Sequence, residues 1–547
     1  MKMFPIPALA ALLIFLSGCS DSGPDPTDTT ADEPKGSEST APSGSDGQSD
    51  TAADAAAGNN PFFAQSDLPY QMPPFDRIEL EHYKPALEKG MEQQIQQVEE
   101  IADNPEPATF ENTIVAMEQT GDILDRVQPV FGNMAAAHTN EQIQKIQQQI
   151  APKLSEHRDA ILLNPALFER VSGLYEQRDQ LDLDAESKRL LERYYKDFVR
   201  AGAQLSAEQK DRLREINGRL AELSTEFSQR VLKEVNDSAV VVDSREALAG
   251  LSDSRIETAA EDAASRDLED KYAITLQNTT QQPPLRSLQN RDLRERIQKV
   301  SEARGTRGND YDTRAIVTET VKLRAERAKM LGYDTHAAYT LADQTAGTVE
   351  AVNDMLHQIG PPALANAKEE AEDLQALIDE TEEEPFELRS WDWLYYTDKL
   401  RQKRFQFDES KLKPYFEVDS VLKNGVFYFA KQLYGLSFEE RPDLPVYHPD
   451  VRVFEVFDHD GEPLGLFIAD FYARSSKRGG AWMNAYVSQS ELDGTRAVVG
   501  NHLNIPKPPE GEPTLLTFDE AETMFHEFGH ALHGLFSDVR YPRFSGT

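Results

Sequence analysis

Apolar residues recur every three or four positions along most of the chain, the spacing that gathers them on one face of an α-helix. Such stripes run through residues 143–154, 316–331 and 364–377. The clearest stripe begins with a capping box at Ser206 and Gln209 and continues through Leu213, Ile216, Leu220, Leu223, Phe227 and Val231. We interpret these stripes as the core faces of a helical bundle, with a coiled coil as the alternative. The pattern predicts a mainly helical protein.

Strand signals gather in one late part of the chain. Residues 451–457 are rich in Val and Phe, a turn follows at Asp458-His-Asp-Gly461, and residues 464–471 form a second apolar run. Two such runs around a turn predict a β-hairpin. Residues 497–505 are a further candidate strand. We therefore expect a small sheet inside an otherwise helical protein.

The N-terminus has the pattern of a bacterial export signal. Residues 8–16 are apolar, but the run is shorter than the roughly 20 residues that span a bilayer. Leu16-Ser-Gly-Cys19 resembles the lipobox of bacterial lipoproteins, so we expect residues 1–18 to be a signal peptide and Cys19 to be lipidated. The alternative is a plain signal with a cysteine nearby by chance. Because Ser20 and not Asp follows the cysteine, the expected location is the cell envelope, at the periplasmic face of the outer membrane.

Composition and charge refine this organisation. Residues 19–60 are mostly Ser, Thr, Asp, Gly, Pro and Ala and predict a disordered acidic tether, followed by a helical region at 61–300 and a second region at 301–547. The 547 residues include 57 Lys+Arg and 95 Asp+Glu, a net charge of −38, which argues against nucleic acid as a partner. Contact with a membrane is expected through lipidated Cys19 only. Since Cys19 is the one cysteine, we expect no disulfide.

The candidate chemistry lies on a helix that is expected to begin at a capping box formed by Thr517 and Glu520. His526 and His530 follow on this helix, four residues apart and therefore one turn apart on one face. Two neutral imidazoles and an oxygen ligand suit Zn²⁺, with a fourth position left for water. We predict that His526 and His530 bind one zinc ion per chain; the alternative is a surface helix that happens to carry two histidines.

Two neighbouring residues are assigned different roles. Glu527 is next to a metal ligand and is the candidate general base, because a carboxylate there can take a proton from water and return it to a leaving amine. His533 also falls on the histidine face, but His526 and His533 are about 10 Å apart along a straight helix. Three ligands in one row give poor tetrahedral geometry, so we interpret His533 as a core residue or as a neighbour of the site.

Several stretches from about residue 60 onward resemble the thimet oligopeptidase family of zinc metallopeptidases. The most specific is Phe525-His-Glu-Phe-Gly-His-Ala-Leu-His-Gly-Leu-Phe536, and others are Thr109-Phe-Glu-Asn-Thr, Trp391-Asp-Trp393 and Lys477-Arg-Gly-Gly-Ala-Trp-Met483. The resemblance implies a two-lobed, zincin-type helical body with a small sheet near the metal helix. It also implies a deep channel that admits short unfolded peptides. It assigns residues 301–547 to the catalytic region.

The resemblance carries three further expectations. The third protein ligand, a Glu, is expected beyond residue 547, so the catalytic region is interpreted as incomplete at its C-terminus. The expected activity is the release of C-terminal dipeptides from peptides, with internal cleavage or peptide binding without cleavage as alternatives. A monomer is favoured, and cobalt or manganese in place of zinc stays open, since imidazole and carboxylate accept several metals.

Overall fold

The structure is a computed structural model that describes residues 59–277, 282–406, 411–509 and 511–546. The proposed signal peptide, the lipidation site Cys19 and nearly all of the predicted tether lie outside these residues, so those sequence-based predictions are not tested by it. Among the described residues, no helix combines the length and the apolar run that crossing a membrane requires.

Helices form most of the described chain, and several begin at the predicted caps. The Ser206 hydroxyl accepts a hydrogen bond from the Gln209 amide, and the Gln209 side chain accepts one from the Ser206 amide. The α-helices are α2 (Leu80–Ala102), α3 (Ala116–Glu118), α4 (Asp122–Ala137), α5 (Glu141–Leu162), α6 (Pro165–Glu176), α7 (Ala185–Ala201), α8 (Ala207–Asp237), α9 (Asp253–Ala264), α10 (Arg291–Glu302), α11 (Arg314–Met330), α12 (His336–Leu341), α13 (Val349–Thr381), α14 (Ser390–Phe405), α15 (Val418–Ser420), α16 (Tyr428–Tyr434) and α17 (Phe518–Leu535). The prediction of a mainly helical fold is confirmed.

The predicted late strands are present in a mixed five-stranded sheet with the order β3-β4-β5-β7-β6. Its strands are β3 (Ser437–Glu440), β4 (Arg452–Phe457), β5 (Pro463–Tyr472), β6 (Trp482–Val487) and β7 (Ala497–Ile505). The hairpin of β4 and β5 is confirmed, and the turn at Asp458–Gly461 joins the two strands. β5 and β7 pair in parallel, whereas the other neighbours in this sheet are antiparallel. A separate pair of short strands, β1 (Val240–Val242) and β2 (Tyr272–Ile274), lies elsewhere.

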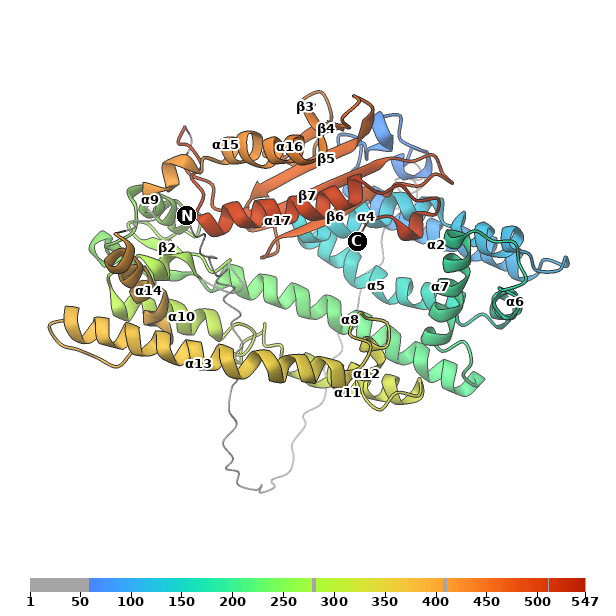
Figure 1. Ribbon diagram of the computed structural model, residues 1–547, viewed down its shortest axis with the longest axis horizontal. Coiled ribbons are helices and arrows are strands. Elements are labelled where there is room, and N and C mark those ends of the chain that lie inside the picture. The colour runs from blue at the N-terminus through green and yellow to red at the C-terminus, as the bar shows by residue number, and fades with distance from the viewer. Residues whose placement is uncertain (1–58, 278–281, 407–410, 510, 547) are drawn as a thin grey trace, which may run out of the picture.

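Each face of the five-stranded sheet is covered by helices, and alternate residues of β5 show this. Leu466 and Ile468 join a core cluster with α2 and α4, while Phe467 and Ala469 join another with α16 and α17. Successive side chains of a strand point to opposite faces, so a strand buried on both sides is apolar throughout. In Figure 1 the sheet and α17 form the upper part of the molecule, and the long helices α8 and α13 run below.

The predicted apolar stripes are buried in part. On α8, Leu213, Ile216 and Leu223 are buried, but Phe227 is 39% exposed. On α13, Leu377 is buried, whereas Leu364 is 57% exposed. The interpretation of 364–377 as a core face therefore holds only at its C-terminal end. There α13 packs against α14, whereas the side chain of Leu364 stays exposed.

Close approach of α17 to the sheet depends on a glycine. A Cβ at Gly534 would lie 2.8 Å from Val499 Cγ1 on β7 and 2.9 Å from Met483 Cε on β6. We therefore expect Gly534→Ala to lower the free energy of unfolding by about 1–3 kcal/mol, because overpacking displaces the helix from the sheet. Urea denaturation would measure the change.

Gly529 provides the matched control on the same helix. A Cβ there meets nothing within 4 Å, so Gly529→Ala should raise stability by about 0.5–1 kcal/mol through helix propensity alone. Opposite signs for the two substitutions are the expected result. Equal effects would mean that the helix–sheet contact at Gly534 is not tight.

Candidate metal centre

Helix α17 places the candidate site on the sheet. The Thr517 hydroxyl accepts a hydrogen bond from the Glu520 amide at 3.2 Å, and the Glu520 carboxylate accepts one from the Thr517 amide at 2.7 Å. This is the predicted capping box. Met524, Phe528, Ala531 and Leu535 are buried in the core cluster shared with the sheet. These residues fix one face of α17, which leaves the opposite face free for polar groups.

The two candidate metal ligands lie side by side. The ring centroids of His526 and His530 are 5.0 Å apart with an angle of 79° between the ring planes. Both residues are exposed, as is Phe525 on the same helix. Neither histidine lines the two cavities of about 1000 Å³ and 620 Å³ that described residues bound. The donor set fits a divalent metal, because two adjacent imidazoles can turn their nitrogens toward one ion.

Glu527 differs from its neighbours in burial. It is only 7% exposed, although both adjoining histidines face outward. Burial raises the pKa of the Glu527 carboxyl above its usual range, and the nearby His526 and His530 oppose this shift. A carboxylate whose pKa is raised is a stronger base than an ordinary glutamate carboxylate, which suits proton transfer.

His533 is exposed, so the interpretation of this residue as part of the core is wrong. The helix surface at this point faces away from the sheet, which is why an apolar position was not needed. That His533 neighbours the site without binding metal stays a prediction. Within the described residues, the one group of three possible metal ligands is Asp458, His459 and Asp460, in the exposed turn between β4 and β5.

One strand that packs against α17 was not predicted as a strand. β6 is an edge strand that packs against α17, and it pairs with β7 on one side only. An edge strand offers a row of unpaired backbone donors and acceptors to an extended peptide. Its sequence, Trp482-Met-Asn-Ala-Tyr-Val487, lacks the turn residues and alternation that mark a hairpin strand.

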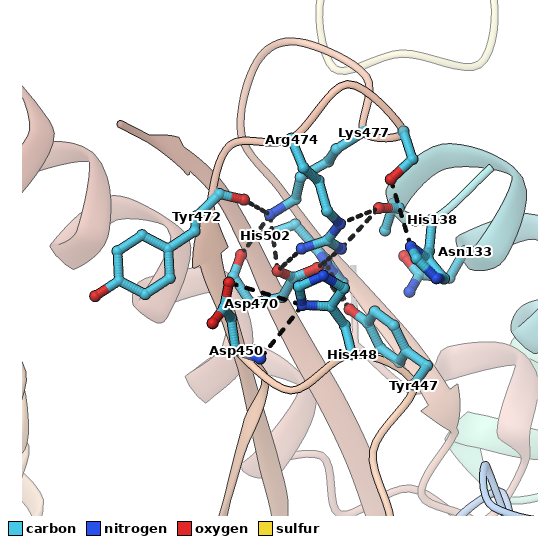
Figure 2. Close-up of polar contacts among 12 residues, drawn as sticks. Asn133, His138, Tyr447, His448, Asp450, Asp470, Tyr472, Arg474, Lys477 and His502 are labelled. Carbon is cyan, nitrogen blue, oxygen red and sulfur yellow. Dashed lines mark hydrogen bonds and ion pairs between the residues drawn. The ribbon is translucent and has the colours of Figure 1, made fainter. Parts of the chain in front are cut away.

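A buried polar network supports β6 and β7, and sequence reasoning missed it. Figure 2 shows Arg474, Lys477 and His502 converging on Asp470, which lies in β5. Both Asp470 and Lys477 are fully buried, 2.9 Å apart, and the Tyr447 hydroxyl donates to Asp470 at 2.6 Å. Burial raises the pKa of Asp470, but hydrogen bonds from His502 and Arg474 and the charge of Lys477 more than offset this. Its pKa is therefore well below the usual range.

This network joins three parts of the fold. His502 Nε2 is 2.6 Å from Asn484 Oδ1, and the His502 ring stacks on Trp482 with centroids 4.7 Å apart, so the network reaches β6. Arg474 also donates two hydrogen bonds to the Ala137 carbonyl at the end of α4. The N-terminal helices and the strands that carry α17 are thereby held together.

We expect Asp470→Asn to lower the free energy of unfolding by about 3–5 kcal/mol, because it leaves buried Lys477 without its counter-charge. Chemical denaturation would measure the loss. Asp443→Asn is the control: Asp443 is 59% exposed and pairs with Arg441 at 2.8 Å, so about 0–1 kcal/mol is expected. Similar losses in the two variants would contradict the role assigned to burial.

A helix that carries His-Glu-x-x-His against a mixed sheet, within a mainly helical body, defines a metallopeptidase. Comparison with known proteins agrees. The model of peptidase family M3 matches residues 285–547. The dipeptidyl carboxypeptidase of Escherichia coli is 45% identical over 488 residues, which cover 89% of this chain and 72% of that protein. Oligopeptidase A of the same organism is 31% identical over 485 residues, covering 87% and 71%. The chain belongs to peptidase family M3.

These findings confirm the resemblance, the helical metallopeptidase fold and the expectation that short peptides are the substrates. They overturn the predicted location at the cell envelope. The similarity extends over about nine-tenths of the chain, and none of the relatives named here is named for an envelope or a lipid anchor. A relative in Arabidopsis thaliana, 28% identical, is named a probable cytosolic oligopeptidase A. The prediction of an envelope location depended on the N-terminal pattern alone. The peptidase region that follows this pattern does not support that location.

Proposed function

We propose that the protein is a zinc-dependent peptidyl-dipeptidase that removes dipeptides from the C-termini of short peptides. The observation that carries this proposal is the 45% identity to a dipeptidyl carboxypeptidase, compared with 31% to oligopeptidase A over a region of nearly the same length. The placement of the His-Glu-x-x-His residues on α17 supports the same reaction class.

The metal is held by His526 and His530, whose rings lie 5.0 Å apart. Zinc, when bound, supplies Lewis acidity that lowers the pKa of water and polarises a peptide carbonyl. A third protein ligand, expected from the family resemblance alone, stays a prediction. The division of the chain at about residue 300 and the monomeric state also stay predictions.

Glu527 acts as the general base. Its carboxylate accepts a proton from the attacking water and then donates that proton to the nitrogen of the leaving amine. Two observations support this role: Glu527 is buried beside two outward-facing histidines, and the pKa of the Glu527 carboxyl is raised. A raised pKa strengthens the carboxylate as a base, and the proton it takes up is then available to the product.

The substrate backbone adds to the free edge of β6. This strand packs against α17, the helix that carries the histidines, so an extended peptide paired with it would lie near that helix. Backbone hydrogen bonds of this kind are independent of the peptide sequence, which suits an enzyme that acts on many short peptides. They also require an unfolded substrate, because a folded protein has few free strand edges to offer.

The alternative within the same class is an endopeptidase, and the match to oligopeptidase A favours it as the second candidate. A peptide-binding protein without activity is the third. One assay separates them: full-length protein with zinc is given a peptide with a free C-terminus and the same peptide amidated at its C-terminus, and products are read by mass spectrometry.

We expect cleavage only of the peptide with the free C-terminus, at the bond two residues from that C-terminus. Internal cleavage of both peptides would identify the endopeptidase instead. Binding of both without any cleavage would leave only the third candidate.

A further inference from the structure

A large cavity bounded by described residues lies in the helical body, away from the metal helix. Its volume is about 1000 Å³, and its walls come mainly from α4, α5, α7, α8, α11 and α12. None of the described residues that line it belongs to α17 or to the five-stranded sheet. The mechanism proposed above makes no use of this cavity.

Positive side chains gather on one part of its wall. Arg158 of α5 and Arg324 of α11 line the cavity, and neither makes a hydrogen bond or an ion pair with any residue that the structure describes. Arg327, one turn further along α11, donates only to the Asn217 side chain, at 3.2 Å. All three residues line the same cavity; burial lowers the pKa of Arg327, and the positive charges of Arg324 and Arg158 lower it further.

Two buried donors in this wall lack an acceptor. They are Arg200 Nη1 and Arg327 Nε, and both residues line the cavity. Arg200 and Arg327 converge on the same ring: their guanidinium carbons are 4.6 Å and 5.6 Å from the centroid of Tyr339. A buried guanidinium nitrogen can only donate, so an acceptor oxygen is what would satisfy it.

Three carboxylates lie near these arginines, and two of them, Asp197 and Asp343, already pair with other cations. Asp159 accepts two hydrogen bonds from Asn217, and Asp197 pairs with Arg193 and Arg543. Asp343, near Arg200, is shared with Arg193 and Lys196. The cluster of Arg158, Arg324 and Arg327 therefore keeps an excess of positive charge, in a chain whose net charge is −38.

The rest of the wall is apolar. Leu220 and Phe227 of α8 face the cavity together with Val317 and Val321 of α11. Phe227, Val317 and Val321 are 39%, 46% and 55% exposed, so this surface is accessible to a ligand. A cavity of this size with an arginine cluster at one part and aliphatic walls at another is complementary to a small molecule with one anionic end and an apolar body.

We propose that this cavity is a second peptide-binding site, separate from the metal centre, in which Arg158, Arg324 and Arg327 bind the C-terminal carboxylate of a short peptide. Charge and shape both favour a peptide as the ligand. Guanidinium groups match a carboxylate in hydrogen-bond geometry, and the aliphatic walls match peptide side chains. The proposed function brings short peptides with free carboxylates to this enzyme, both as substrates and as products. A peptide bound in the cavity would contact the helices α5, α8 and α11.

The test measures binding of the dipeptide Ala-Phe by isothermal titration calorimetry. It uses full-length protein with His526→Ala and His530→Ala, so that binding through the metal is removed and failure does not bear on the proposed function. We expect binding of Ala-Phe to weaken at least about tenfold when its carboxylate is amidated, because charge-assisted hydrogen bonds are lost. Adding Arg158→Gln and Arg324→Gln should produce a similar loss.

Arg189→Gln is the matched control, since Arg189 lies on α7 with its side chain 62% exposed and does not line the cavity. Unchanged Ala-Phe binding is expected for it. Equal binding of the free and amidated dipeptides would overturn the proposal, as would inorganic phosphate binding as tightly as Ala-Phe, which would make the site one for a free ion.

Thermal unfolding of the ligand-free protein with Arg158→Gln and Arg324→Gln guards against a folding artefact. We expect the Tm to stay unchanged or to rise, because two mutually repelling charges are removed. A lower Tm would show that these guanidiniums stabilise the fold through partners of their own, which contradicts a ligand-binding role.

Discussion

Replacing Glu527 with glutamine is expected to lower kcat for peptide hydrolysis by about 10²–10⁴-fold, the usual contribution of a general acid–base group. Glutamine has the size of the native side chain, so the packing of this buried residue is kept. It cannot accept a proton at neutral pH, which removes both the activation of water and the protonation of the leaving amine. Steady-state kinetics with an unblocked peptide would measure the loss.

The metal content of the Glu527→Gln protein should equal that of the wild type, because Glu527 is assigned no ligand role. Glu522→Gln is the control, since Glu522 is an exposed carboxylate on the same helix, five residues earlier. Its kcat should be unchanged. Full activity in Glu527→Gln would contradict the assignment of the base.

The second large effect is expected from the ligands themselves. Loss of a residue that merely orients a metal ligand costs about 10–100-fold in metal affinity. Removing an imidazole that binds the ion directly, by His526→Ala or His530→Ala, should cost more than about 100-fold and abolish activity at ordinary zinc concentrations. Metal content after dialysis, read by atomic emission, would measure this.

The substitution His533→Ala tests whether His533 binds the metal or only lies near it. His533 is exposed on α17, three residues after His530, and differs from the two candidate ligands only in its place along the helix. We expect the His533→Ala protein to keep its zinc. If it loses zinc as readily as the His526→Ala protein, the assignment of two ligands on this helix needs revision.

The helices and their caps were readable from the sequence because they depend on residues close together in the chain. The capping boxes at Ser206 and at Thr517 formed as expected, each through two reciprocal hydrogen bonds. The spacing of His526 and His530 likewise fixed their adjacency, since one helical turn is a local quantity. Local patterns therefore predicted the element that carries the site.

The sheet was only partly predictable, because pairing joins distant segments. Nothing in β5 or β7 indicates that these two strands pair in parallel. β6 escaped detection because its residues are mostly half-buried and follow no clear alternation. Yet the edge strand is what would receive a peptide, so the part of the site that depends on tertiary contacts was the part that was missed.

The buried charges were hidden for the same reason. Asp470 stands within an apolar run, where its sequence context gives no sign that Arg474, Lys477 and His502 surround it. The exposed part of α13 shows the reverse problem. Its apolar positions have helical spacing, but burial depends on whether another element packs there.

The central claim is that peptide hydrolysis depends on a metal held by His526 and His530. The most direct measurement is the cleavage of an unblocked peptide by the full-length protein before metal removal, after treatment with a chelator, and after zinc is added back. We expect activity to disappear with the metal and to return at about one zinc per chain. Undiminished cleavage by the metal-free protein would contradict it.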